Sequence, residues 1–203
     1  MSIKVIKALS DDEIIDGCKK HQKKAQCMLY EKYAPLLMAV CLRYMGNVQE
    51  AEDILHDGFI KILSNIGQYR HEGSFEGWMK RIIVNTIMTY LKKSNRIRIS
   101  SDTIYNSEVL ADELENEINT ENFRELILNA EFSEADIHQV INELQDDYKT
   151  VFNLYTFEDF KHKEIAELLH MTENTSRSKL LRARKLIQKR LVDLVKENKI
   201  NTL

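Results

Sequence analysis

One segment near the C-terminal end concentrates cations that could bind phosphate groups. Between Thr175 and Arg190 stand seven Lys or Arg and no Asp or Glu, although the whole chain has a formal net charge of -3. Local positive charge on an acidic protein is typical of a surface that binds nucleic acid. The alternative is a solvated basic face without a ligand.

Helical phase divides this segment into an apolar side and a basic side. At about 100° per residue, one side carries Ser176, Leu180, Ala183, Ile187 and Leu191. The opposite side carries Ser178, Arg182, Lys185 and Lys189. Such a helix can pack on its own domain and still enter a major groove. Arg184 and Arg190 lie nearer the apolar side, where packing or a phosphate contact suits them better than base contact.

A shorter amphipathic helix should precede the basic one. Its apolar residues are Ile165, Ala166, Leu168 and Leu169, and the pair has the spacing of a helix-turn-helix. Further periodic apolar positions begin at Ile137. The region from there to the C-terminus should therefore form one compact helical domain.

A second basic face is expected on a helix from Phe75 to about Lys93. Its outward row is Arg81, Asn85 and Thr89, with Lys80, Lys92 and Lys93 nearby. An amide among cations suits a site that hydrogen-bonds one base while neutralising its phosphates. The aromatic residues Tyr69, Phe75 and Trp78 could stack on unpaired bases, or Phe75 and Trp78 could belong to the core.

The helix expected over Val48 to Ile66 carries a mostly acidic outer row. Its members are Glu52, Asp53, His56, Asp57 and Lys61. Such a row should repel nucleic acid and attract a basic protein partner. An ordinary solvated face is the alternative.

Composition places these helices in an all-α protein of two small domains. The 203 residues include one Pro and six Gly, and apolar residues recur with helical spacing. Ser10 with Glu13 and Asn47 with Glu50 indicate helix starts, and Pro35 is expected in the first turn of a helix that runs to Met45. We expect domains at 1–98 and 137–203, joined by an acidic linker at 99–136, part of which could be helical after Thr120.

The remaining residue patterns argue against several other classes of protein. No apolar run approaches a membrane span, and no signal-peptide core is present, so we expect a cytoplasmic protein without membrane insertion. Cys18, Cys27 and Cys41 should be reduced core thiols, with a zinc site that includes His21 as the alternative. We find no catalytic constellation and no phosphate-binding Gly loop, and expect no enzyme activity, metal, cofactor or small-molecule substrate.

Two blocks of the sequence resemble the extracytoplasmic-function sigma factors, the small members of the sigma-70 family. The segments Glu52 to Lys61 and Phe75 to Thr86, including Trp78 and Asn85, resemble their domain two. The segments His162 to Leu169 and Thr175 to Lys185 resemble their domain four. The resemblance covers roughly Leu29 to Lys93 and Ile137 to Leu191.

The resemblance implies a dissociable subunit that binds core RNA polymerase and directs it to promoter DNA, with an anti-sigma factor as a further partner. It assigns polymerase binding to Asp53, His56, Asp57, Ile60 and Lys61. It assigns the melted minus-ten element to Tyr69, Phe75, Trp78, Lys80, Arg81, Asn85, Thr89, Lys92 and Lys93. It assigns the minus-thirty-five duplex to Thr175, Arg177, Ser178, Lys179, Leu181, Arg182 and Lys185.

The chain departs from the family pattern at several positions. His170 and Asp159 stand where Gly is common, and Ser176 stands where a β-branched apolar residue is common. Thr89 replaces a frequent amide, and Gln145 replaces a frequent Pro. The main alternative function is a stand-alone helix-turn-helix repressor or activator that binds a palindromic operator as a dimer.

Overall fold

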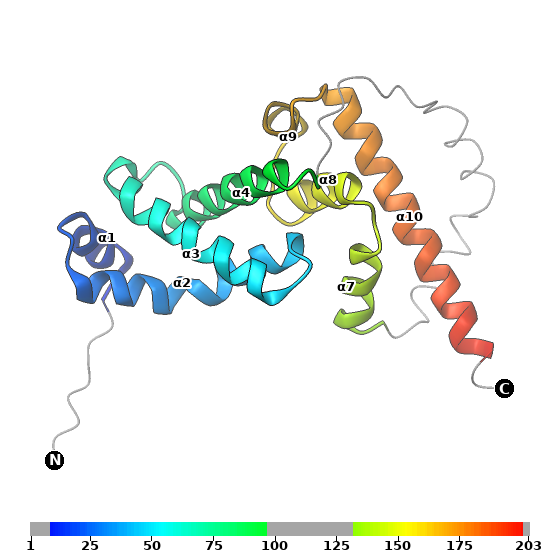
Figure 1. Cartoon of the computed structure of the whole chain (residues 1–203), viewed down its shortest axis with the longest axis horizontal. Coiled ribbons are helices and arrows are strands. Elements are labelled where there is room, and N and C mark those ends of the chain that lie inside the picture. The colour runs from blue at the N-terminus through cyan, green and yellow to red at the C-terminus, as the bar shows by residue number, and fades with distance from the viewer. Residues whose placement is uncertain (1–8, 97–131, 201–203) are drawn as a thin grey trace, which may run out of the picture. The chain divides into compact units, whose positions relative to one another are not determined.

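The computed structural model describes residues 9–96 and 132–200, and every regular element in these ranges is helical (Figure 1). This confirms the all-α prediction. The chain divides into two compact units, Met1–Tyr90 and Leu91–Leu203, and we describe each unit by itself. The acidic segment and its possible helix after Thr120 lie mostly outside the described residues.

Unit 1 is built from α1 (Asp11–Lys19), α2 (Lys23–Tyr44), α3 (Val48–Asn65), the short 3₁₀ helix η1 (Ile66–Gln68) and all but the last three residues of α4 (Phe75–Lys93). Ser10 and Glu13 form the expected capping box at the start of α1. The Asn47 side chain accepts a hydrogen bond of 2.8 Å from the Glu50 amide and so caps α3. Both predicted helix starts are therefore confirmed.

The position predicted for Pro35 was wrong. Pro35 lies inside α2, twelve residues after the helix begins at Lys23, and α2 ends at Tyr44 rather than Met45. Proline cannot donate to the carbonyl one turn earlier, which normally disfavours a helix interior. Here the buried residues before and after it, Leu29, Tyr33, Leu37 and Val40, hold one continuous helix against the core.

The core of unit 1 requires α3 and α4 to approach closely. Gly58 of α3 faces Ile83 of α4, and a Cβ placed at Gly58 would lie 2.2 Å from the Ile83 Cδ1 atom. Ile83 is fully buried, as are Ile62 and Met79. The absence of a side chain at Gly58 therefore sets the distance between the helix with the acidic row and the helix with the basic row.

A polar contact also fixes α1 on α2. One carboxylate oxygen of Asp11 accepts hydrogen bonds from Lys32 Nζ at 2.6 Å and Tyr33 Oη at 2.7 Å. These bonds, that from Lys32 first, lower the pKa of Asp11. Burial and the Asp11 bond raise the pKa of Tyr33, so its hydroxyl remains a donor.

Unit 2 contains α7 (Glu134–Asn142), α8 (Asp146–Thr156), α9 (His162–Leu169) and α10 (Glu173–Ile200). The long α10 packs against α7, α8 and α9 (Figure 1). Its apolar side is the predicted one, since Ser176, Leu180, Ala183 and Leu191 are buried. Ser133 and Asp136 form a capping box on α7, and the Ser133 bonds lower the pKa of Asp136.

The turn between α9 and α10 has the geometry of a helix-turn-helix. His170 ends α9 in the left-handed region, with a φ of 54°. The Met171 amide then donates to the Ala166 carbonyl at 3.0 Å, which satisfies one of the last carbonyls of α9. Thr172 Oγ1 accepts from the Thr175 amide at 3.1 Å and caps α10.

The cysteines depart partly from expectation. Cys18 and Cys41 are buried free thiols, as predicted, but Cys27 is exposed on α2. Its helical position turns it away from the side of α2 that packs on the core. Within residues 9–96 and 132–200, no three His, Cys, Asp or Glu side chains are arranged to hold a metal ion, so the zinc alternative has no support there. The described helices include none whose length and hydropathy would let it cross a membrane.

Candidate nucleic-acid and polymerase interface

The outward row of α4 is exposed as its helical phase predicts. Arg81, Asn85 and Thr89 are all exposed, while Ile83, Val84 and Ile87 between them are buried. Thr89 Oγ1 donates a hydrogen bond of 2.8 Å to the main-chain carbonyl of Asn85, so this bond does not involve the side-chain amide of Asn85. Among the described residues, that side-chain amide makes no hydrogen bond. It can therefore both donate to and accept from a base edge.

The other basic residues of α4 flank this row. Lys80 is half-buried and pairs with Glu76 at 2.8 Å, one turn earlier on the same helix. Lys92 is half-buried and Lys93 is exposed at the C-terminal end of α4. Cations in the last turn also interact favourably with the helix dipole.

The aromatic residues at the start of α4 pack on one another. The Phe75 ring stacks on the Trp78 ring with centroids 5.7 Å apart, and the Tyr69 ring lies 5.0 Å from Phe75. Tyr69 and Phe75 are each 7 % exposed, and Tyr69 Oη donates to the Gly73 carbonyl at 2.9 Å. Core packing therefore describes Phe75 and Tyr69 in this structure, whereas Trp78 is half-buried at the edge of the cluster.

The outer face of α3 presents the expected acidic row. Asp53, His56 and Asp57 are exposed, and Ile60 beside them is 52 % exposed. An exposed Ile flanked by carboxylates is an arrangement suited to a partner with basic and apolar groups. Lys61 is turned toward α4, because its Nζ donates 3.1 Å to Thr86 Oγ1.

Two of the residues expected to bind duplex DNA are held by α8. Lys179 Nζ bonds to Asp147 Oδ2 and lies 5.7 Å from the centroid of the Tyr148 ring. Arg182 Nη1 donates 3.3 Å to Tyr148 Oη. The start of α8 thus contacts the face of α10 that carries the expected DNA-binding residues.

Other residues of that face project further. The Arg177 side chain is 61 % exposed and makes a 3.5 Å pair with Glu173, and Leu181 is 51 % exposed. Ser178 is exposed, whereas Thr175 and Lys185 are half-buried. Arg184 is exposed, which contradicts its expected place near the buried side, and it lies 5.7 Å from the Tyr155 ring centroid.

A polar contact inside the helix-turn-helix joins its two helices. His162 Nδ1 lies 2.9 Å from the Oγ atom of Ser176, a residue with no solvent exposure. The His162 ring also stacks on Tyr155 of α8 with centroids 4.7 Å apart. Burial first, and then the charge of Arg177, lower the pKa of His162, with Glu173 acting in the opposite direction. These effects favour the neutral form of the ring.

Arg190 connects α10 to α7, as its place near the buried side allows. Its guanidinium pairs with Glu143, the C-terminal cap of α7, at 2.8 Å and with Glu197 of α10 at 3.0 Å. These hydrogen bonds, that with Glu143 first, raise the pKa of Arg190. The bonds occupy Arg190 within its own unit, so a role in contacting bases has no support.

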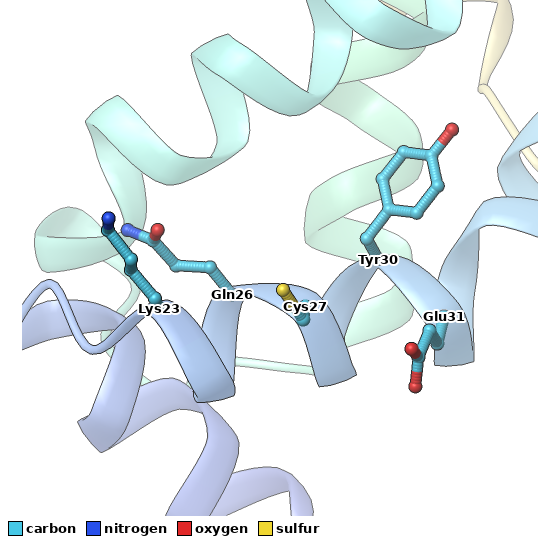
Figure 2. A pocket seen from close by; sticks show the side chains of 5 residues that line it. All are labelled: Lys23, Gln26, Cys27, Tyr30 and Glu31. Atoms are coloured by element: carbon cyan, nitrogen blue, oxygen red, sulfur yellow. The ribbon is translucent and has the colours of Figure 1, made fainter.

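A pocket of about 490 Å³ lies along α2, and Figure 2 shows the five side chains that line it. They are Lys23, Gln26, Cys27, Tyr30 and Glu31. None of these residues was expected to bind DNA or polymerase. All five belong to α2.

The two blocks of the chain match two profiles of one family. Sigma-70 region 2 matches residues 29–97, and Sigma-70 region 4 matches residues 134–187. The first match contains the basic row of α4 and the acidic row of α3. The second contains the helix-turn-helix.

Curated relatives match along nearly their whole length. The chain is 30 % identical over 188 residues to the ECF RNA polymerase sigma factor SigW of Bacillus subtilis, covering 89 % of this chain and 96 % of the relative. It is 29 % identical to the RNA polymerase sigma-H factor of Pseudomonas aeruginosa, covering 92 % and 96 %. The chain belongs to the extracytoplasmic-function sigma factors.

A solved structure shares the fold of this sigma factor. It is the sigma factor RpoE in complex with the anti-sigma factor NepR from Bartonella quintana, with a TM-score of 0.50 and 17 % identity. The match covers 81 % of this chain and 94 % of that one. Family membership makes this sigma factor a transcription initiation factor rather than a member of an enzyme family.

Sequence reasoning missed the residues of this sigma factor that hold its basic helix. Asp147 and Tyr148 contact Lys179 and Arg182 from α8, more than thirty positions away in the chain. A single sequence carries no signal for such a pairing. The only local indication was Asp147 in the first turn of a helix, where a carboxylate is common for another reason.

Proposed function

We propose that this sigma factor binds core RNA polymerase and directs it to promoters with two DNA-binding faces, one in each unit. The observation that supports this most strongly is the pair of exposed polar rows on α4 and α10, each carried by a unit with its own core. Two tethered faces can engage two promoter elements together, because the tether raises the effective concentration of the second contact.

We assign the minus-thirty-five duplex to α10. Its contacts would come from Thr175, Arg177, Ser178, Lys185 and Arg182, with Leu181 against a thymine methyl group. The exposure of Arg177 and Leu181 supports this assignment. Arg182 is suited to a bidentate contact with guanine, since a guanidinium presents two parallel donors.

We assign the melted minus-ten element to α4 and the loop before it. Asn85 would hydrogen-bond a base swung out of the stack, while Arg81, Lys80, Lys92 and Lys93 neutralise phosphates. Thr89 borders the same surface. Trp78 is the aromatic residue available for stacking, with Tyr69 and Phe75 supporting its ring from the core.

We assign core polymerase to the outer face of α3. Asp53, His56 and Asp57 would contact a basic surface, with Ile60 as the apolar centre. Lys61 would act at the edge, since its amine bonds to Thr86. Charge separation supports this division: the acidic row would avoid DNA while the basic row of α4 attracts it.

Domain limits and cellular context follow from these roles. We propose domain two at residues 1–98, the acidic linker at 99–136 and domain four at 137–203. The protein would act in the cytoplasm, where core polymerase and promoter DNA are found. An anti-sigma factor is an expected partner, as it is for the RpoE protein that shares the fold.

Reconstitution with sigma-depleted core polymerase tests the proposal. Core polymerase plus this protein should start transcription at promoters mapped in cells that overexpress it, and core polymerase alone should not. A matched variant, Asp53→Lys with Asp57→Lys, should abolish initiation by reversing the charge of the α3 row without touching either DNA-binding face. Tight binding to a palindromic operator by a dimer, without polymerase-dependent initiation, would establish the stand-alone regulator instead.

A further inference from the structure

Two basic residues of α10 contact different groups of α8. Lys179 and Arg182 both belong to the basic helix, and both were expected to bind duplex DNA. In the structure Lys179 points at α8, where its side chain is 19 % exposed and its amine bonds to the Asp147 carboxylate. The Arg182 guanidinium also contacts α8, where its Nη1 atom donates a hydrogen bond to the hydroxyl of Tyr148.

Asp147 is well placed to hold Lys179. Its Oδ1 accepts a hydrogen bond of 3.1 Å from the Tyr148 amide, and its Oδ2 accepts from Lys179. Both oxygens are therefore used inside the unit. Asp147 lies in the first turn of α8, where the helix dipole interacts favourably with a carboxylate.

Tyr148 contacts Lys179 with its ring and Arg182 with its hydroxyl group. Its ring lies beneath the Lys179 amine at 5.7 Å, which adds to the Asp147 pair. Its hydroxyl accepts from Arg182 Nη1 at 3.3 Å, which restricts the guanidinium through one of the five N–H donors of an Arg side chain. Fixing a long side chain before binding reduces the entropy that is given up when it meets DNA.

We propose that Asp147 and Tyr148 are positioning residues for recognition of the minus-thirty-five duplex. Tyr148 orients Arg182 toward the DNA, and Asp147 keeps Lys179 as a link between α8 and α10 rather than a phosphate contact. The inference rests on the proposed function of α10. It changes the expected role of Lys179 and adds two residues to the site.

The first test is a double-mutant cycle between Tyr148 and Arg182. Holoenzyme made with the full chain is titrated against a duplex that the wild-type holoenzyme selects from a library randomised at the minus-thirty-five element. Tyr148→Phe keeps the ring and removes only the hydroxyl, and should weaken binding about fivefold, as expected for one hydrogen bond. In an Arg182→Ala background the same change should have no further effect.

A merely structural Tyr148 would give a different result in that cycle. The effect of Tyr148→Phe would be the same with and without Arg182, and this outcome would overturn the role of Tyr148. An unchanged affinity for Tyr148→Phe in the wild-type background would do so as well. Failure of the wild-type holoenzyme to initiate would instead reject the proposed function, before any variant is compared.

The second test uses the salt dependence of the same binding reaction. A variant that no longer neutralises one phosphate should show a slope of log affinity against log salt that is smaller by about 0.9. Asp147→Asn combined with Lys179→Gln removes one charge of each sign and should leave the slope unchanged. Arg177→Gln, two residues away on α10 with a side chain that is 61 % exposed, should reduce it. A reduction by the double variant equal to that of Arg177→Gln would show that Lys179 binds phosphate and would overturn the role of Asp147.

Discussion

The basic faces of α4 and α10 differ in how their polar side chains are held. On α10, Lys179 and Arg182 bond to groups of α8. On α4, Asn85 is exposed, and its amide makes no hydrogen bond within the described part of the chain. A side chain held in place suits a rigid duplex whose base edges have fixed positions, whereas an exposed amide can adjust to a base that leaves its stack.

The contacts that hold α4 and α10 in place also differ. The α4 face depends on an apolar contact, the close approach of Gly58 to Ile83. The α10 face depends on polar links, including the contact of His162 with Ser176. Substitutions at these points should therefore affect the two faces separately.

The largest effect is expected from Gly58→Val. The new side chain would overlap Ile83 and push α4 away from α3, which should lower the free energy of unfolding by about 2 to 3 kcal/mol. Promoter opening should be abolished, while binding to a minus-thirty-five duplex is retained. Denaturant unfolding and open-complex footprinting measure the two effects. Gly67→Val is the matched control, since nothing lies within 4 Å of a Cβ there.

Asn85→Ala should have the next largest effect. Removing the amide should reduce open-complex formation about tenfold, the equivalent of one or two hydrogen bonds, because the captured base no longer has its partner. Binding to closed duplex should not change. Gln68→Ala removes an exposed amide from the same unit and should behave as wild type. An equal reduction in duplex binding and opening would argue against base capture by Asn85.

Ser176→Val should cost less, about 1 kcal/mol in the free energy of unfolding of unit 2. The substitution introduces a β-branched apolar residue, which would leave His162 Nδ1 without its partner. In a His162→Phe background the cost should shrink or reverse, because no polar atom is then left unpaired. Denaturant unfolding of the wild type, the two single variants and the double variant measures the coupling free energy between Ser176 and His162. Additive changes in the free energy of unfolding would contradict this prediction.

The smallest effect is a pH dependence caused by His162. Its pKa in the folded chain lies below the usual 6.5, so the unfolded chain takes up the proton first as the pH falls. The contribution of His162 to stability is therefore present above about pH 6.5 and decreases below it. Unfolding midpoints between pH 7.5 and pH 5.5 should fall less for His162→Gln than for wild type. Parallel profiles would exclude His162 as the cause.

Local patterns in the sequence predicted several helix starts and the buried sides of several helices. Capping residues such as Ser10 and Asn47 identified helix starts, and apolar periodicity identified α3, α4 and the buried side of α10. These signals lie within a few residues of the structure that they predict. Pro35 shows their limit, because a rule about one residue was outweighed by packing along the whole of α2.

The candidate site was predictable only in part. Phase alone placed Arg81, Asn85 and Thr89 on the exposed side of α4. It could not show that Lys179 turns toward Asp147, since that depends on how α8 packs on α10. Arg184 was placed wrongly for a related reason: its guanidinium lies over the Tyr155 ring of α8, and phase within one helix does not predict a contact between helices.

The left-handed backbone at His170 and Asp159 limits which residues can replace them. Their φ angles are 54° and 57°. Gly, Asn, Asp and His tolerate such angles, whereas β-branched residues scarcely do. The α8–α9 and α9–α10 turns therefore each contain a position that accepts only a few residue types.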